Sequence, residues 1–360
     1  MIEDTRVKNL IKLSNIKMNS SRMKKILLNN KEILDEESFI NKLKEKRELS
    51  NEEIARSKEF DLKRQLKVLL YDKISIITFE DENYPERFKN LEDAPPILFC
   101  KGKLLSEDSN AVGIVGTRRA TQYGKIIARR LARRLSSLGI TIISGLARGI
   151  DTQAHLGALE GGGRTIGVMG TGIDLLYPPG NKNLAQKIVE EGALITELPP
   201  NSPPLAYHFP ARNRIISGLS KAIIAIQAPL KSGVFSTVSW ALEYGRDVYA
   251  LPGDITREAS KGTNKLLKMG AIPFTGYKDI LENTDLKIQE KGIRKEKKVK
   301  DLTEDEKKVY NLLNLEPKSA ERLAHEADLK PQYLLAVLVL LEMKGLAREV
   351  GGKRYIREEE

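Results

Sequence analysis

The sequence predicts an α/β protein with a parallel, doubly wound sheet, a small helical domain before it and a winged helix after it. From residue 111 onward, short apolar runs alternate with helical patterns, which is typical of strands joined by crossover helices. Residues 1–75 are polar and show only helical spacing. Residues 301–360 contain three helical patterns followed by a hairpin pattern, which is the outline of a winged helix.

The N-terminal region, residues 1–75, is predicted to be a small helical domain. Its apolar residues recur at helical spacing, first around Ile11 and Leu13 and later around Leu62 and Leu66. These apolar patterns are short, so the sequence specifies the helices of this region only weakly.

The central region, residues 76–285, contains the predicted sheet. A first strand at 74–79 is followed by a proline-rich passage, and the helix after the 111–115 strand has an apolar face. Ligands of open parallel sheets bind at the carboxyl ends of the strands, so the turns after these strands are the expected binding region. The later strands are predicted near residues 111–115, 140–143, 165–169, 193–196, 222–227, 247–251 and 272–274.

A basic linker is predicted at residues 286–300, which hold seven basic and two acidic side chains. The winged helix follows, with helices near 303–314, 319–328 and 331–345 and a hairpin that turns at two glycines. Residues 301–357 hold ten basic and ten acidic side chains, and the third helix is apolar on nearly every face. A helix that reads a DNA groove needs polar side chains, so we expect this module to make protein contacts.

The net charge of +11 indicates a polyanionic partner. The excess peaks in residues 81–282, which carry 25 basic and 19 acidic side chains. Basic proteins of this kind bind nucleic acid or anionic surfaces, and the chain shows no amphipathic membrane anchor. Nucleic acid is therefore the expected partner.

The sequence indicates a cytoplasmic protein. It has no apolar run long enough for a membrane span, and its first residues lack the pattern of a signal peptide. Its single cysteine, Cys100, excludes an intrachain disulfide and fits a reducing compartment. Cys100 ends an apolar run, so we expect a buried side chain rather than a nucleophile.

Turns rich in glycine and arginine follow the predicted strands. Glycine lets the backbone approach an anion closely, and the N–H groups at the start of the next helix point toward it. Arginine adds a planar, permanently charged fork that suits phosphate oxygens. Several such turns side by side predict a groove for a polyanion. The residues are Gly116, Thr117, Arg118 and Arg119 in the first turn, Ser144, Gly145, Arg148 and Gly149 in the second, and Arg164, Thr171 and Gly172 around the third.

The segment 207–214 combines aromatic and basic side chains. Tyr207 and Phe209 come directly before Arg212, Asn213 and Arg214. Guanidinium groups suit phosphates, and base stacking on an aromatic ring contributes roughly 1–3 kcal/mol per base. Duplex DNA hides its base faces, so this combination favours single strands. In the alternative interpretation, Phe209 belongs to the core and Arg212 caps the sheet.

Two later turns complete one rim of the predicted sheet. They follow or flank the strands near 222–227 and 247–251, and both carry small polar side chains beside a lysine. Their residues of interest are Lys231, Ser232, Gly233, Thr263 and Asn264.

Cofactor and catalytic motifs are missing from these turns. The first turn lacks the three-glycine dinucleotide fingerprint, and no Walker loop is present, so no cofactor is expected. Asp151 and His155 are four residues apart at a helix start and could share a metal, but no third ligand has suitable spacing. The favoured interpretation is that Asp151 caps the helix. We assign no catalytic and no metal-binding residue.

The ordered set of motifs resembles the DprA (Smf) DNA-processing family. The resemblance runs from about residue 74 to 280 and extends more loosely to both ends. Thr117 stands where the family usually has serine, Gln227 where an acidic residue is common, and 234–237 departs from the usual Ser-Leu-Ile-Thr. The motifs that carry the resemblance are Gly116-Thr117-Arg118, 144–151, 170–179, 209–214, Ser232-Gly233 and Gly262-Thr263-Asn264.

The resemblance implies an extended Rossmann-like domain that binds single-stranded DNA as a homodimer. It also implies a SAM-like or helix-hairpin-helix-like N-terminal domain and a non-enzymatic role. In that role the protein protects single-stranded DNA and loads RecA onto it during natural transformation or DNA repair. By the same resemblance, the DNA-binding positions are Arg118, Arg164, Phe209, Arg212, Asn213 and Arg214.

An alternative is a nucleotide-processing enzyme of the lysine-decarboxylase-like group, the nucleoside monophosphate phosphoribohydrolases. That group would show a Pro-Gly-Gly-x-Gly-Thr loop followed by glutamate. The turns at 178–181 and 231–234 supply no such loop. A nucleoside monophosphate release assay separates the two functions.

Overall fold

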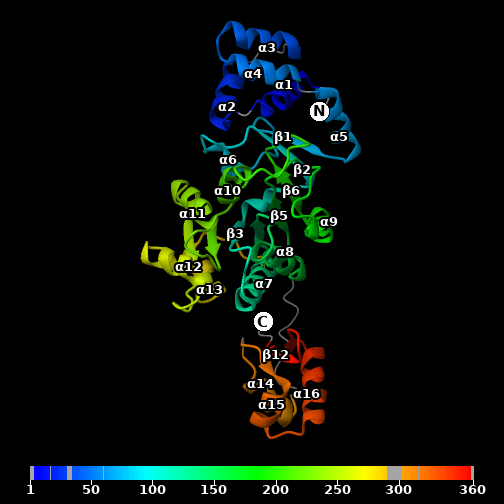
Figure 1. Cartoon of the computed structure of the whole chain (residues 1–360), viewed down its shortest axis with the longest axis vertical. Coiled ribbons are helices and arrows are strands. Elements are labelled where there is room, and N and C mark those ends of the chain that lie inside the picture. The colour runs from blue at the N-terminus through cyan, green and yellow to red at the C-terminus, as the bar shows by residue number, and fades with distance from the viewer. Residues whose placement is uncertain are drawn as a thin grey trace. The chain divides into compact units, whose positions relative to one another are not determined.

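The structure is a computed structural model that describes residues 4–16, 18–30, 35–59, 61–289, 302–314 and 316–357. The chain forms two compact units, Met1–Gln289 and Glu290–Glu360 (Figure 1). Within the described ranges, no helix is long and apolar enough to cross a membrane. Residues 290–300 of the predicted basic linker lie outside the described residues.

Short helices form the first part of the larger unit. Asp4, Asn19 and Asp61 each begin a helix by accepting a hydrogen bond from a backbone N–H of its first turn. Apolar residues of these helices share one core with the nearby strands, including Ile11 and Phe99. The predicted domain boundary at residue 75 stays a prediction. The helices are α1 Thr5–Ser14, α2 Ser20–Asn29, α3 Glu36–Glu45, α4 Asn51–Glu59 and α5 Leu62–Tyr71.

The predicted, mostly parallel sheet is confirmed. Its nine strands lie in the order β1-β2-β6-β5-β4-β3-β7-β8-β9. Strand β2 pairs antiparallel with both β1 and β6, and the other pairings are parallel. Strand β2 was not predicted from the sequence; its apolar residues directly follow two prolines. The strands are β1 Ser75–Thr78, β2 Ile97–Gly102, β3 Ala111–Val115, β4 Thr141–Ser144, β5 Thr165–Val168, β6 Ala193–Thr196, β7 Ala222–Ala225, β8 Asp247–Ala250 and β9 Ile272–Pro273.

Helices cover both faces of this sheet (Figure 1). One face packs against α7, α8 and α13, and the other against α6, α10, α11 and α12. The bounds are α6 Glu86–Lys89, α7 Gln122–Ser137, α8 Ile150–Glu160, α9 Lys182–Glu191, α10 His208–Leu219, α11 Val234–Glu243, α12 Glu258–Lys268 and α13 Tyr277–Asn283, with short 3-10 turns at Ser106–Ser109 and Pro179–Asn181.

The strand order of the sheet reverses between β3 and β7. From β3, the chain adds β4, β5 and β6 on one side, and then β7, β8 and β9 on the other. The loops after β3 and β7 therefore diverge at this point, which is where open α/β sheets form their binding crevice. Here the Thr117 backbone N–H donates to the Gln227 carbonyl at 2.7 Å.

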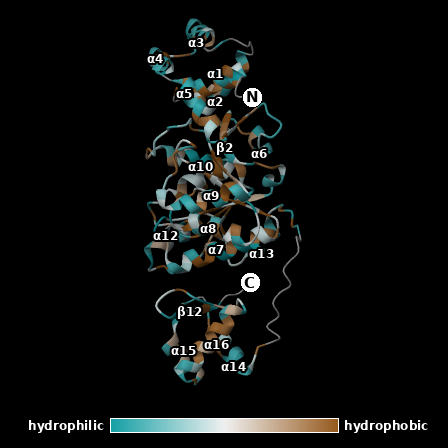
Figure 2. Ribbon diagram, turned by 90° about the vertical axis from the view of Figure 1, so that its right-hand side faces the viewer, coloured by the Kyte–Doolittle hydropathy of each residue, from teal (hydrophilic) through white to brown (hydrophobic). Residues whose placement is uncertain are grey.

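The smaller unit is a winged helix, as predicted. Three helices pack on a small sheet of order β10-β12-β11. Helix α16 contributes Leu334 and Leu338 to the core but exposes Val339 and Met343, and Figure 2 shows its apolar character. The elements are α14 Glu304–Leu312, β10 Lys318–Ser319, α15 Ala320–Ala327, α16 Pro331–Met343, β11 Ala347–Glu349 and β12 Arg354–Arg357.

Candidate nucleic-acid interface

The glycines of the first two turns allow those turns to pack together. A side chain on Gly149 would lie 2.4 Å from the Thr117 carbonyl oxygen, and Gly149 has a φ of 85°. A side chain on Gly116 would lie 2.4 Å from the Ile150 side chain. Glycine is needed here because the turns after β3 and β4 touch through their backbones. This contact brings the arginines of both turns to one edge of the sheet.

Exposed cations gather along this edge. The structure leaves Arg118 and Arg119 exposed after β3, Arg148 exposed after β4, and Lys231 exposed after β7. All four follow the carboxyl ends of parallel strands. They remain the predicted phosphate contacts.

Phe209 lies beside one of these cations. The Arg118 Cζ atom is 5.3 Å from the centroid of the Phe209 ring. The ring also packs on Gly170, where an added Cβ atom would lie 2.8 Å from a ring carbon. The centroids of the Phe209 and Tyr177 rings are 5.8 Å apart. Phe209 is half-buried, so its position fits neither a deep core residue nor a freely exposed ring.

Arg212 points inward instead of toward the edge. Its side chain is buried, and its guanidinium donates to the carbonyls of Gly145, at 2.7 Å, and Val168. Burial lowers the pKa of Arg212 to about 10, opposed by the charge of Asp151. Arg212 therefore ties α10 to the ends of β4 and β5. Contact between Arg212 and DNA stays a prediction. Here its Nη1 donates within the protein, and its buried Nε has no hydrogen-bond partner among the described residues.

Asp151 is not the N-cap of α8, contrary to the favoured interpretation. Gly149 holds that position, and the Asp151 carboxylate lies in the first turn and accepts from the Ala147 N–H at 3.2 Å. Burial raises the pKa of Asp151 to about 6, and the nearby charge of Arg212 opposes this rise. The glycine takes the cap because the backbone there has a positive φ.

His155 is buried and bonded to the sheet. Its Nδ1 lies 2.7 Å from the Thr165 hydroxyl, which itself donates to the Ile142 carbonyl. Nδ1–H is therefore the donor, and Nε2 has no hydrogen-bond partner within the described residues. Burial lowers the pKa of His155 to about 3, so the ring is neutral. Among the described residues, no three potential ligands form a metal cluster.

Asn213 and Arg214 also bond within the protein. The Asn213 amide donates to the Gly233 carbonyl at 3.3 Å and to the Ser236 hydroxyl at 2.7 Å, at the start of α11. The Arg214 guanidinium donates to the Ser20 hydroxyl at 2.8 Å and to the Glu197 carboxylate. Asn213 therefore supports the turn after β7, and Arg214 links α10 to the N-terminal helices.

Arg164 lies at the opposite edge of the sheet. It directly precedes β5, whereas Arg118 lies in the turn after β3, and these strands run parallel. Its guanidinium donates to the Asp108 carboxylate at 2.8 Å and to the Lys103 carbonyl at 2.7 Å. The expectation that all the motif arginines form one groove is thus corrected for Arg164.

The hydroxyls of the candidate residues are used internally. The side chains of Ser144 and Thr171 are buried and donate to the carbonyls of Ile114 and Leu175, each at 2.6 Å. Thr263 is also buried and donates to Ser260. The remaining small residues stabilise turns. Gly172 packs against the Pro199 carbonyl, Ser232 accepts a hydrogen bond from the Val234 N–H, and Gly233 is the N-cap of α11. The Asn264 amide accepts from the Gly253 N–H and donates to the Gly253 carbonyl.

Two residues of this edge were not chosen from the sequence. Gln227 accepts from the Thr121 backbone N–H at 3.0 Å through its side chain, which positions the start of α7. Tyr177 contributes a second ring beside Phe209. The aromatic residue in the turn after β5 was a usable signal for Tyr177.

Comparison with known families agrees with this architecture. Residues 75–285 match the family model of DNA recombination-mediator protein A. The chain belongs to this family. Residues 294–353 match the model of the DprA winged helix domain.

Relatives of this DprA family member support the same fold. Protein Smf of Synechocystis is 35% identical over 78% of this chain and 79% of the relative. DprA of Streptococcus pneumoniae, a solved structure, is 34% identical with a TM-score of 0.67, covering 76% of this chain and 96% of that one. DNA processing protein A of Helicobacter pylori, solved for its single-stranded DNA binding mode, is 33% identical with a TM-score of 0.52, covering 58% and 94%.

Proposed function

We propose that this chain binds single-stranded DNA along the carboxyl edge of its sheet and loads RecA recombinase onto it. The chain belongs to a family of DNA recombination mediators. The similar DNA processing protein A of Helicobacter pylori binds single-stranded DNA. The homodimer and the RecA contact are proposed from the family resemblance, and the cytoplasmic location is proposed from the sequence.

The contact between Arg118 and Phe209 carries the proposal. A guanidinium next to a half-buried aromatic ring provides a phosphate partner and a stacking partner within one nucleotide's reach. Duplex DNA offers phosphates but no open base faces. The pair therefore favours single strands over duplexes.

The charge on the same edge supports the proposal. Arg119, Arg148 and Lys231 are exposed on the turns beside Arg118. Each contact that neutralises a phosphate releases counterions, so binding should weaken as salt rises. Single strands lose affinity with a slope of about 0.7 per phosphate contact in a log–log plot.

We further propose that the chain acts by binding and not by catalysis. Asp151 and His155 are the two titratable residues that come closest to forming an acid–base pair, and both are buried. The Asp151 carboxylate supports the backbone of its turn, and the His155 ring bonds to Thr165. Neither is presented at the exposed edge that carries Arg118.

Titration of single-stranded and duplex oligonucleotides of one sequence, over a range of salt, tests the proposal. We expect tighter binding of the single strand and a negative salt slope. Equal affinity for both forms would contradict the proposal. Release of a base from nucleoside monophosphates would instead support the enzyme alternative. RecA loading is tested by RecA filament formation on strands preincubated with this protein.

A further inference from the structure

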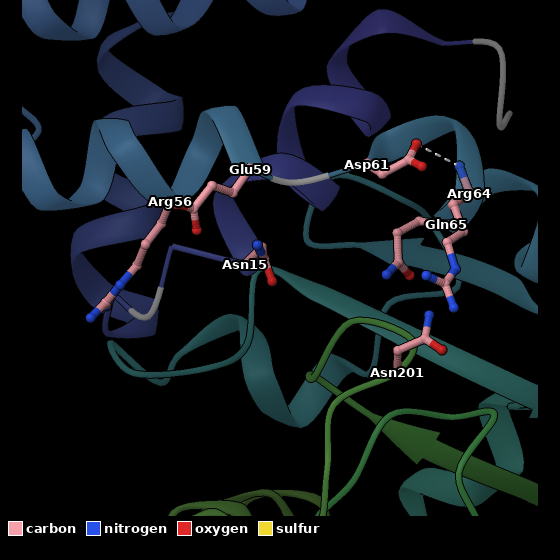
Figure 3. Close-up of a pocket in the computed structure, with 7 residues that line it drawn as sticks. All are labelled: Asn15, Arg56, Glu59, Asp61, Arg64, Gln65 and Asn201. Carbon is pink, nitrogen blue, oxygen red and sulfur yellow. Dashed lines mark hydrogen bonds between the residues drawn. The ribbon is translucent and has the colours of Figure 1, made fainter.

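A polar cavity lies between the N-terminal helices and the loop that follows β6. Its volume is about 430 Å³, within the range of small-molecule sites. Figure 3 shows its lining side chains, which come from the end of α1, from α4 and α5, and from the β6 loop. The lining residues are Asn15, Arg56, Glu59, Asp61, Arg64, Gln65 and Asn201.

Gln65 lines this cavity, and its buried side chain has an unmatched acceptor. The residue is only 8% exposed, and its Nε2 donates to the Pro200 carbonyl at 3.1 Å. Its Oε1 has no hydrogen-bond partner among the residues that the structure describes. A buried acceptor without a donor is unfavourable. An N–H or O–H group of a bound molecule that reaches this oxygen would satisfy it.

Arg64 and Asn201 lie close to Gln65. Figure 3 shows the Arg64 guanidinium turned toward the Gln65 and Asn201 amides, whereas Arg56 points away. The Arg64 backbone N–H donates to the Asp61 carboxylate at 3.0 Å. Arg64 thus places a permanent cation near two amides, which offer both donors and acceptors.

One loop links the cavity to the proposed DNA-binding edge. The loop that carries Asn201 begins at the carboxyl end of β6 and leads directly to α10 and Phe209. The Asn201 backbone N–H donates to the Asp174 carboxylate at 2.8 Å, and the Gly172 N–H donates to the Ser202 carbonyl at 2.9 Å. These bonds join the β6 loop to the β5 turn that supports Phe209.

We propose that this cavity is a subsite for one nucleotide. Arg64 binds the phosphate, the Gln65 Oε1 accepts from an N–H of the base, and the Asn201 amide bonds a second group on the base edge. The inference rests on the proposed function, because it places the cavity on the path of the bound strand. A nucleotide within that strand and a free nucleoside monophosphate share this chemistry.

Substitution of Arg64 tests the subsite, with Lys63 as the matched control. Lys63 is an exposed cation on the same helix and does not line the cavity. Arg64→Ala should weaken binding of long single strands about two- to fivefold and flatten the salt slope by about 0.7. Lys63→Ala should leave the salt slope near that of the wild-type protein. Equal behaviour of the two variants would overturn the subsite.

A second measurement locates the contact directly. Single strands that contain 4-thiothymidine should photo-crosslink to peptides holding Gln65 or Asn201, and Arg64→Ala should reduce this crosslink. Loss of the crosslink with excess free thymidine monophosphate would show that the free nucleotide also enters. Crosslinks only elsewhere in a protein that binds the strand would reject the subsite. No strand binding at all would instead reject the proposed function.

Discussion

Arg212 occupies the space that a side chain on residue 145 would need. A Cβ atom on Gly145 would lie 2.5 Å from the Arg212 Nη1, and the same guanidinium donates to the Gly145 carbonyl. The two residues are 67 positions apart in the chain. Gly145 is therefore explained by packing against an arginine of the protein, whereas the sequence alone suggested close approach of an anion.

Arg212→Lys should weaken single-stranded DNA binding without changing its salt slope. Lysine keeps the charge but lacks the guanidinium whose Nη1 donates to both carbonyls. Each buried carbonyl left without a donor costs about 1–3 kcal/mol of stability, so the unfolding temperature should also fall. Gly145→Ala should act in the same way, because its methyl group displaces the guanidinium.

Arg118→Ala is the contrasting variant for this experiment. Arg118 is exposed, so its loss should flatten the salt slope by about 0.7 while leaving the unfolding temperature near wild type. Salt titrations and thermal melts of both variants separate the two roles. A flattened slope for Arg212→Lys would show that Arg212 contacts phosphate directly.

Phe209→Ala should lower the affinity for single strands by roughly 1–3 kcal/mol with little change in salt slope. The Phe209 ring packs on Gly170 and lies beside the Arg118 guanidinium. Its loss removes the aromatic ring on which a base is proposed to stack. Phe209→Trp keeps an aromatic face and serves as the control. Normal DNA affinity together with a much lower unfolding temperature would assign Phe209 to the core.

Asp151→Asn should become more stable relative to the wild-type protein as the pH rises from about 4 to 7. The folded-state pKa of Asp151 is about 6 against an ordinary value of 3.8, so folding favours the protonated carboxyl. Below pH 3.8 the carboxyl is protonated in both states, and above pH 6 it is ionised in both. The wild-type protein should therefore lose on the order of 3 kcal/mol of stability across this window relative to the variant.

Urea unfolding of both proteins at several pH values measures this difference. Other carboxylates titrate alike in the two proteins and cancel in the comparison. A difference in unfolding free energy that does not depend on pH would contradict the raised pKa.

A protein that ends at Gln289 should retain most of the single-strand affinity. The larger unit ends at this residue, and the Gln289 N–H still donates to the Leu138 carbonyl at 2.9 Å. Residues 301–357 carry no net charge, and α16 exposes apolar residues including Leu340 and Met343. Fluorescence anisotropy with single strands measures the affinity, and circular dichroism checks that the shortened protein is folded. Abolished binding by a folded protein would assign the main DNA site to the winged helix.

The sequence by itself determined the order and type of most elements. Apolar runs and helical spacing are local patterns, so strands such as β3 and β6 were predicted with matching bounds. The winged helix and the exposed arginines of the first two turns followed in the same way. The strand β2 was missed because its apolar residues directly follow two prolines, which are typical of turns.

Only the tertiary structure decided where each arginine of the motifs points. Arg118 stays exposed, Arg212 turns into the sheet, and Arg164 lies at the opposite edge. A guanidinium binds whichever acceptors the surrounding backbone brings within reach, and those acceptors come from distant segments. The cavity at Gln65 has the same origin, because its wall forms where α5 meets the loop after β6. Local sequence cannot show contacts between distant segments, since those contacts depend on how the separate elements pack.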